Sequence, residues 1–152
     1  MRIHFPRPTC LFLLLSCLVV FSSCDDRDKK EEIKQALANY DRLIKKMDAD
    51  SIAQMYTADG DLGDIAHGRD SIKKFLSTFV NVKVLSVHSS SEKIEIKEDT
   101  AIQNGRYDRV AVVNSKDTVR PAGTFIAKWV WKINEGWNIQ RMTTTPDNNS
   151  NK

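Results

Sequence analysis

The stretch that decides the fold is residues 40–68, which read YDRLIKKMDADSIAQMYTADGDLGDIAHG. It begins as the end of an amphipathic helix and passes into an acidic turn. Asp48 and Asp50 are natural caps for a short second helix over residues 51–56, because a carboxylate accepts hydrogen bonds from the free amides of a first helical turn. An Asp-Gly pair then ends this helix, and a short strand is predicted over residues 62–65, leading into a corner rich in aspartate.

Amphipathic patterns extend on both sides of this stretch. A first helix is predicted over about residues 29–47, with apolar positions at helical spacing: Ile33, Leu37, Tyr40, Ile44 and Met47. A third helix follows Gly68, with the apolar face Ile72, Phe75, Leu76 and Phe79. After residue 80 the period becomes twofold, which is typical of strands, and a tight hairpin is predicted at residues 134–136. Three helices followed by long antiparallel strands predict an α+β domain.

Residues 1–23 have the layout of a secretory signal. Two arginines supply a basic start, residues 11–21 are apolar, and small residues precede Cys24. A cysteine directly after small residues resembles the bacterial lipobox, whose cysteine is acylated and becomes the new N-terminus. We therefore expect a lipid on Cys24; plain secretion with cleavage near Ser23 is the alternative.

The remaining chain divides into a tether, one domain and a tail. Residues 24–32 are almost wholly charged and are predicted to be a solvated tether, residues 33–145 form the domain, and residues 146–152 form a disordered polar tail. The lipid would hold the domain at the bacterial cell envelope. The outer membrane or cell surface is favoured and the inner membrane remains possible, because bacteria read acidic residues after the lipidated cysteine differently.

Composition excludes several classes of partner and site. The chain has 23 Lys and Arg against 20 Asp and Glu, and removal of the signal takes away two of the arginines and no acid. A nearly neutral domain lacks the basic footprint of a nucleic-acid-binding protein, so no nucleic-acid partner is expected. Cys24 would be the only cysteine of the mature chain, which excludes a disulfide framework. His88 has no partner at metal-ligand spacing; we expect no metal ion and no cofactor.

The order of these elements resembles the NTF2-like superfamily, in particular its SnoaL-like and DUF4440-type domains and ketosteroid isomerase. Three motifs carry the resemblance: DADSIAQMYTADGDL at 48–62, Gly68 followed by DSIKKFL at 70–76, and WVWKINEGWNIQRM at 129–142. The resemblance implies a cone in which three N-terminal helices pack on a strongly curved, mostly antiparallel sheet, leaving a cavity at one end.

The spacing from Tyr40 to Asp64 is similar to that of ketosteroid isomerase. In that enzyme a tyrosine of the first helix donates to the developing enolate oxygen, and an aspartate at the end of the first strand shuttles the proton. The resemblance therefore implies Tyr40 and Asp64 as catalytic candidates. The second oxyanion donor of that enzyme, a protonated aspartate, is missing here, because the matching face carries Ala127 and Trp129. Loss of one such donor lowers a rate on the order of 100-fold or more.

The implied cavity would hold a small, mostly apolar molecule, with these candidate ligand-binding residues: Tyr40, Tyr56, Asp64, His67, Phe125 and Trp129. Each also has a structural interpretation, the tyrosines and tryptophans as core and Asp64 as a brace of its corner. Arg106 and Tyr107 follow a possible bulge at Gly105. They could point a cation and a hydroxyl into the cavity or lie on the outer face.

Three functions stay open at this point. The first is a lipid-anchored domain that binds a small molecule, and the second is an enzyme of the isomerase, dehydratase or cyclase type with Asp64 as general base. The third is a dimeric structural or assembly module. Apolar residues alternate onto both faces of residues 110–113, which suits a homodimer formed through the sheet.

Overall fold

The computed structural model describes residues 22–148, and the prediction of a signal at residues 1–23 falls almost wholly outside them. The helices are α1 (Ser22–Lys46), α2 (Ala49–Gln54) and α3 (Arg69–Leu76). The strands are β1 (Tyr56–Leu62), β2 (Ala66–His67), β3 (Val82–Lys97), β4 (Thr100–Val113), β5 (Asp117–Val119), β6 (Ala122–Lys132) and β7 (Gly136–Pro146). Within residues 22–148, no helix is both long and apolar enough to cross a membrane.

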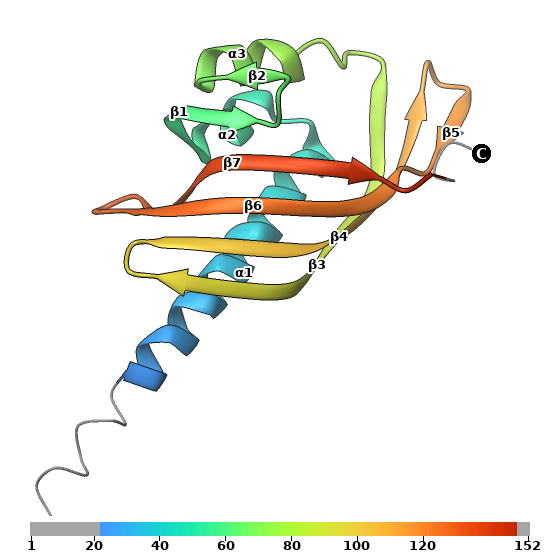
Figure 1. Cartoon of the computed structure of the whole chain (residues 1–152). Coiled ribbons are helices and arrows are strands. Elements are labelled where there is room, and N and C mark those ends of the chain that lie inside the picture. Colours follow the sequence, from blue (N-terminus) through green and yellow to red (C-terminus); the bar gives the residue numbers. More distant parts are fainter. Residues whose placement is uncertain (1–21, 149–152) are drawn as a thin grey trace, which may run out of the picture.

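The strands form one curved, mixed sheet of seven strands in the order β2-β1-β7-β6-β4-β3, with β5 paired to β4 (Figure 1). All pairs are antiparallel except β1 with β7, which is parallel. The helix α1 lies across one face of this sheet, and α2 and α3 cover its β1–β2 end. The predicted α+β cone, with three helices on a curved and mostly antiparallel sheet, is confirmed.

The helix α1 is held to the sheet by one buried stripe: Ile33, Leu37, Tyr40, Leu43 and Ile44. It begins at Ser22, earlier than the predicted start near residue 29, so the charged segment of residues 24–32 is helical. Lys and Glu are good helix formers, and residues 26–32 are mostly exposed, as expected of a solvated segment. Its last residue also contacts the sheet, because Glu32 accepts a hydrogen bond from Trp137 Nε1 at 3.1 Å.

The first strand begins earlier than the sequence predicted. The helix α2 is capped by Asp48, whose carboxylate accepts a hydrogen bond from the Ser51 amide at 3.0 Å, as predicted. However, β1 starts at Tyr56, and the Asp-Gly pair that was expected to end the second helix lies inside this strand. Pairing with β7 explains the difference, since Tyr56 lies opposite Ile139 and an irregularity before Asp61 absorbs the glycine.

A close approach at Gly105 bends the sheet. The strands β3 and β4 both turn sharply near their middle (Figure 1), and their register shifts between Ser91 and Lys93. A Cβ atom at Gly105 would lie 2.6 Å from the Phe125 ring and closer still to the Ser90 carbonyl oxygen. Only glycine leaves room for this contact, so the predicted irregularity at Gly105 marks the bend of the sheet.

One end of the concave face is filled by a row of hydrogen-bonded side chains: Trp129, Gln103 and Ser91. Trp129 is fully buried and its Nε1 donates to Gln103 Oε1 at 2.9 Å. The amide of Gln103 donates in turn to Ser91 Oγ at 2.6 Å, which explains why a glutamine can be fully buried here. At the C-terminal end, β7 continues to Pro146 and Asp147 pairs with Arg106, so the first two residues of the predicted disordered tail belong to the fold, and residues 149–152 lie outside the described residues.

We expect Gly105→Ala to destabilise the domain by about 2 kcal/mol or more, because the added methyl group must displace backbone or ring atoms. Urea unfolding measures this change. Asn104→Ala, at the neighbouring and less buried position, serves as the control and is expected to cost less. An unchanged midpoint for Gly105→Ala would contradict the role assigned to the bend.

Candidate functional site

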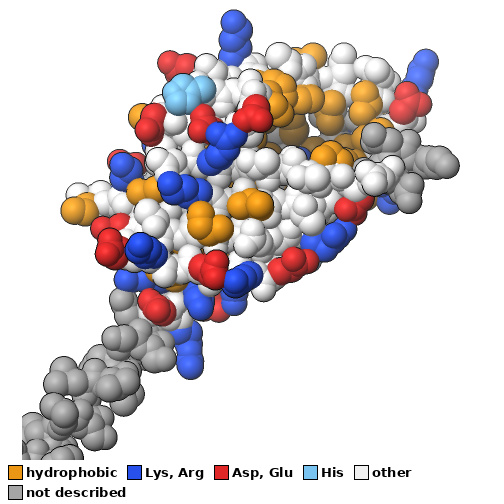
Figure 2. All heavy atoms as spheres, in the orientation of Figure 1, with side chains coloured by type: hydrophobic (Ala, Val, Ile, Leu, Met, Phe, Trp, Pro, Cys, Tyr) orange, Lys and Arg blue, Asp and Glu red, His pale blue; other side chains and the backbone are white. Residues whose placement is uncertain are grey.

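A cavity of about 340 Å³ lies between the helices and the concave face of the sheet. Figure 2 shows its mouth as a hollow lined by hydrophobic side chains. Its wall is mostly apolar and includes residues of α1, α3 and the strands β1 and β3 to β7: Leu37, Ile44, Leu62, Phe75, Leu76, Val84, Ala111, Val119, Phe125 and Met142. Its polar members are Tyr40, Ser89, Tyr107, Arg109 and Thr144. In the part of the chain that the structure describes, no Asp, Glu or His lines it.

The hydroxyl of Tyr40 is oriented by a second tyrosine behind it. The two hydroxyl oxygens of Tyr40 and Tyr56 are 3.3 Å apart, and the rings meet edge to face at 6.4 Å. Tyr56 is fully buried and does not line the cavity. Either hydroxyl can be the donor of this bond, and when Tyr56 donates, its own buried proton is satisfied by Tyr40. The proton of Tyr40 is then available to an acceptor in the cavity.

Burial keeps both phenols protonated. It raises the pKa of Tyr40, and the hydrogen bond with Tyr56 and then the charge of Arg109 oppose this in part. Burial also raises the pKa of Tyr56 well above its usual value. The cavity therefore offers a neutral hydroxyl donor at this point.

Asp41 supports the cavity wall from outside. Its two carboxylate oxygens accept hydrogen bonds from the amide and the hydroxyl of Ser89, at 2.7 and 2.8 Å. Burial raises the pKa of Asp41, and the bonds from Ser89 partly oppose this. The pair fixes α1 to β3 next to the cavity, and it occupies both oxygens of this carboxylate.

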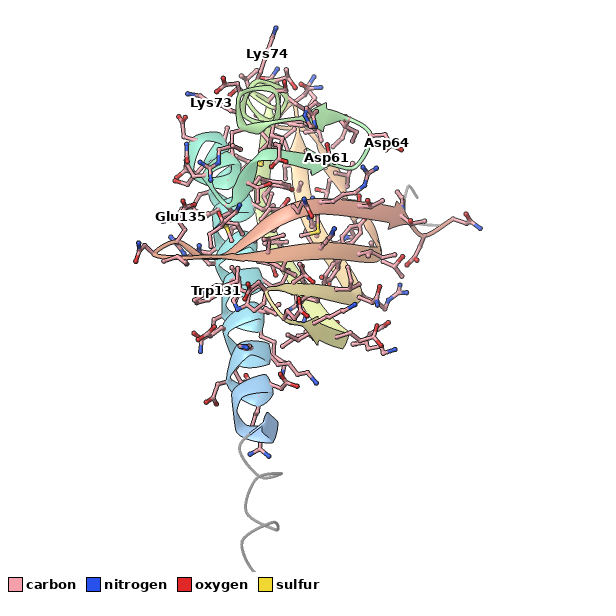
Figure 3. All side chains as sticks on the ribbon, turned by 60° about the vertical axis from the view of Figure 1, so that its left-hand side comes forward. Asp61, Asp64, Lys73, Lys74, Trp131 and Glu135 are labelled. Atoms are coloured by element: carbon pink, nitrogen blue, oxygen red, sulfur yellow. The ribbon has the colours of Figure 1, made fainter. Side chains whose placement is uncertain are left out.

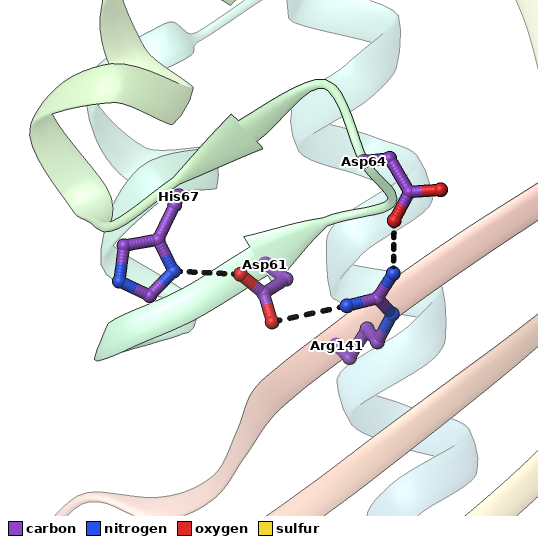
Figure 4. A network of polar contacts seen from close by, with 4 residues as sticks. All are labelled: Asp61, Asp64, His67 and Arg141. Carbon is purple, nitrogen blue, oxygen red and sulfur yellow. Dashed lines mark hydrogen bonds and ion pairs between the residues drawn. The ribbon is translucent and has the colours of Figure 1, made fainter.

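Asp64 lies outside the cavity. Its side chain lies at the surface (Figure 3), is 95% exposed and forms an ion pair with Arg141 of β7. Arg141 also donates a hydrogen bond to Asp61 at 3.3 Å, and the carboxylate of Asp61 lies 2.7 Å from His67 Nδ1. These four side chains form one surface network (Figure 4). The hydrogen bond to His67 is the main cause that lowers the pKa of Asp61. This network ties the β1–β2 corner to β7.

The prediction that Asp64 and Tyr40 share one hollow is therefore wrong. The inward position at this end of β1 belongs to Leu62, which lines the cavity. Gly63, with φ of 55°, starts a turn that carries Asp64 beyond the strand and onto the surface. His67 is likewise exposed and outside the cavity.

Of the remaining candidates, Phe125 lines the cavity, whereas Tyr56 and Trp129 do not. Trp129 fills the opposite end of the concave face with Gln103, so its prediction as a ligand contact is wrong. Of the pair after Gly105, Tyr107 points inward, and Arg106 points outward to Asp147 at 2.6 Å.

The cation in the cavity is Arg109, which the sequence reading missed. Its guanidinium carbon lies 5.1 Å from the centroid of the Tyr107 ring, and its Nε atom is buried without a hydrogen-bond partner. The available signal was twofold alternation continuing beyond Gly105, since Tyr107, Arg109 and Ala111 share one face of β4. Arg109 is the charged residue on this otherwise uncharged strand face, and this pattern marks it as a candidate.

A family model for the SnoaL-like domain matches residues 25–143. The chain belongs to the SnoaL-like domain family. Among curated proteins, a comparison finds no match for this SnoaL-like domain. No three His, Cys, Asp or Glu side chains gather as metal ligands within its described residues.

Solved structures show that the SnoaL-like domain has the NTF2-like fold. It is similar to an NTF2-like protein from Novosphingobium aromaticivorans with a TM-score of 0.69 and 16% identity, over 86% of this chain and 90% of that one. A ketosteroid isomerase-like protein from Erwinia carotovora is similar with a TM-score of 0.66 and 16% identity, over 75% of this chain and 92% of that one. A protein from Catenulispora acidiphila, solved in complex with S-DNPA, is similar with a TM-score of 0.67 and 16% identity, over 78% of this chain and 93% of that one.

We expect Asp64→Asn to leave the binding of an apolar probe unchanged, because the carboxylate lies outside the cavity. Titration with N-phenyl-1-naphthylamine, a neutral fluorophore that brightens in apolar surroundings, measures this. Leu62→Asn is the matched comparison on the same corner and should weaken binding, since it places an amide in the apolar wall. If the Asp64 variant bound the probe more weakly and the Leu62 variant did not, the placement of this carboxylate outside the binding site would be contradicted.

Proposed function

We propose that this SnoaL-like domain binds a small, mostly apolar molecule in the cavity between α1, α3 and the sheet. The observation that carries the proposal is an apolar hollow of about 340 Å³ with a few polar groups on its wall. Ligand sites are typically concave and apolar, with volumes of roughly 300–1,000 Å³ and a small number of oriented polar groups.

Tyr40 would orient the ligand. With Tyr56 as the donor of the tyrosine pair, the Tyr40 proton is available in the cavity, and a carbonyl, hydroxyl or carboxylate oxygen of the ligand would accept it. The protein from Catenulispora acidiphila that shares the fold was solved with S-DNPA bound, which supports small-molecule binding by this architecture.

Binding is favoured over catalysis for a chemical reason. Isomerases and dehydratases of this kind abstract a proton, and the base must reach the substrate directly or through one water. The described residues that line the cavity include no carboxylate or imidazole, and Asp64 points to solvent. An enzyme with Asp64 as general base therefore has no support from the geometry.

Filling the cavity should abolish binding. Ala111 is buried on the inner face of β4 and lines the hollow. Ala111→Phe is expected to weaken the binding of N-phenyl-1-naphthylamine by about tenfold or more, because the new ring occupies the ligand's space. Thr124→Phe adds the same ring on an exposed position of β6 and is the control. Unchanged binding by Ala111→Phe would contradict the proposed site.

We also propose that Cys24 carries a lipid that anchors the domain at the bacterial cell envelope, at the outer membrane or cell surface. Cys24 lies in the first turn of α1, and the α1 residues that line the cavity begin at Leu37. At ~1.5 Å of rise per residue, the helix would hold the cavity about 20 Å or more from the anchor. This geometry would keep the mouth of the cavity in water.

Metabolic labelling with an alkyne fatty acid in a bacterial host tests the anchor. Cys24→Ala should lose the label and leave the membrane fraction, whereas Cys17→Ala should keep it, because Cys17 lies in the segment that is predicted to be removed. A label that survives in Cys24→Ala would rule the anchor out.

The homodimer stays a prediction, which the molar mass in solution by light scattering tests. Ala111 and Val113 line the cavity, so only Val110 and Val112 remain for the outer face. Ile102 and Ile126 are 36% and 54% exposed on the neighbouring strands β4 and β6. These side chains are compatible with a contact through the sheet.

A further inference from the structure

We propose that the ligand of this cavity is an anion, a small apolar body bearing a carboxylate that Arg109 holds. This inference rests on the proposed function and names the chemical class of the ligand.

The first argument is the position of Arg109. It lies on the inner face of β4 between Tyr107 and Ala111, and all three line the cavity. A charged group next to an apolar hollow is costly unless it is paired. No Asp or Glu lines the cavity among the described residues, and the buried Nε atom of Arg109 has no hydrogen-bond partner.

The second argument is that the neighbouring groups leave the guanidinium donors free for a ligand. The contact of Arg109 with Tyr107 is through the face of the ring, 5.1 Å from its centroid. A guanidinium held in this way keeps its N–H donors, which lie in its own plane and match the two oxygens of a carboxylate.

The third argument concerns Asp41, a carboxylate whose pKa is raised by burial and lowered in part by Ser89 and then by the charge of Arg109. Both oxygens of Asp41 already accept hydrogen bonds from Ser89. The described ion pairs include none between Asp41 and Arg109, so the two charges interact only at longer range. The cavity thus combines a cation with the Tyr40 hydroxyl and presents no negative charge of its own.

The size of the hollow sets the apolar part of the ligand. A cavity of ~150 Å³ accommodates benzene, and this one has about 340 Å³. Two fused rings with one carboxylate fit this volume, so naphthalene-2-carboxylate is a suitable probe. Naphthalene-2-carboxamide has nearly the same shape without the charge, and it is the matched comparison.

The experiment measures both affinities by calorimetry at pH 7 for the wild-type domain, Arg109→Met, Arg109→Lys and Arg106→Met. The wild type should bind the carboxylate about 10- to 100-fold more tightly than the carboxamide. Arg109→Met should lose this preference and keep carboxamide binding, and Arg109→Lys should keep part of it. Arg106→Met, on the outer face of the same strand, should behave as the wild type.

Thermal unfolding without a probe separates a binding role from a structural one. Because Arg109→Met removes an unpaired charge, its melting temperature should equal or exceed that of the wild type. A preference that persists in Arg109→Met, or a wild type that binds both probes equally, would overturn the inference and leave the proposed function standing. Failure of the wild type to bind either probe would overturn both. The wild-type ratio decides the matter even if the methionine variant does not fold.

Discussion

The close approach at Gly105 is the constraint on which the rest of the structure depends. There the β3 backbone and the Phe125 ring occupy the space that any side chain would need, and the long β3–β4 pair bends. The bend divides the inner face of β4 into two parts. Gln103, before the glycine, packs with Trp129 in the filled part, and Tyr107, after it, faces the hollow.

This division explains why one face of a sheet can supply both a solid core and a cavity. In the filled part, the indole of Trp129 donates a hydrogen bond to the carboxamide of Gln103, which donates in turn to Ser91. These side chains are therefore buried with hydrogen-bond partners. In the hollow part, the helix α1 contributes Leu37, Tyr40 and Ile44, but the sheet curves away from them. Apolar surface therefore remains there without protein partners, which favours an apolar occupant.

Much of the fold could be predicted from the sequence, because it follows from local periodicity. The apolar stripe from Ile33 to Ile44, the cap at Asp48 and the hairpin with positive φ at Asn134 and Gly136 are all encoded within a few residues. Where the prediction failed, tertiary contacts overrode local preference. Pairing with β7 made the Asp-Gly pair part of β1, although these residues commonly end elements.

The site was harder to predict, because spacing along a chain does not fix the face on which a residue lies. One turn at Gly63 moved Asp64 from the expected inner position to the surface, where Arg141 pairs with it. Trp129 was on the predicted face of β6 but at the filled end, which depends on the position of the bend. Only Tyr40 and Phe125 of the predicted ligand contacts kept their place in the cavity wall.

Arg109 is a charged side chain among the mostly apolar residues of the cavity wall. Burying apolar wall residues stabilises the fold, whereas placing a guanidinium among them opposes it unless something neutralises the charge. Departures of this kind in an otherwise consistent sequence are expected where a chain gives up stability for binding. The surface network of Asp61, Asp64, His67 and Arg141 shows the contrast, because there both carboxylates pair with the guanidinium of Arg141. The unpaired cation, rather than the better-connected corner, is therefore where the chemistry of this domain is concentrated.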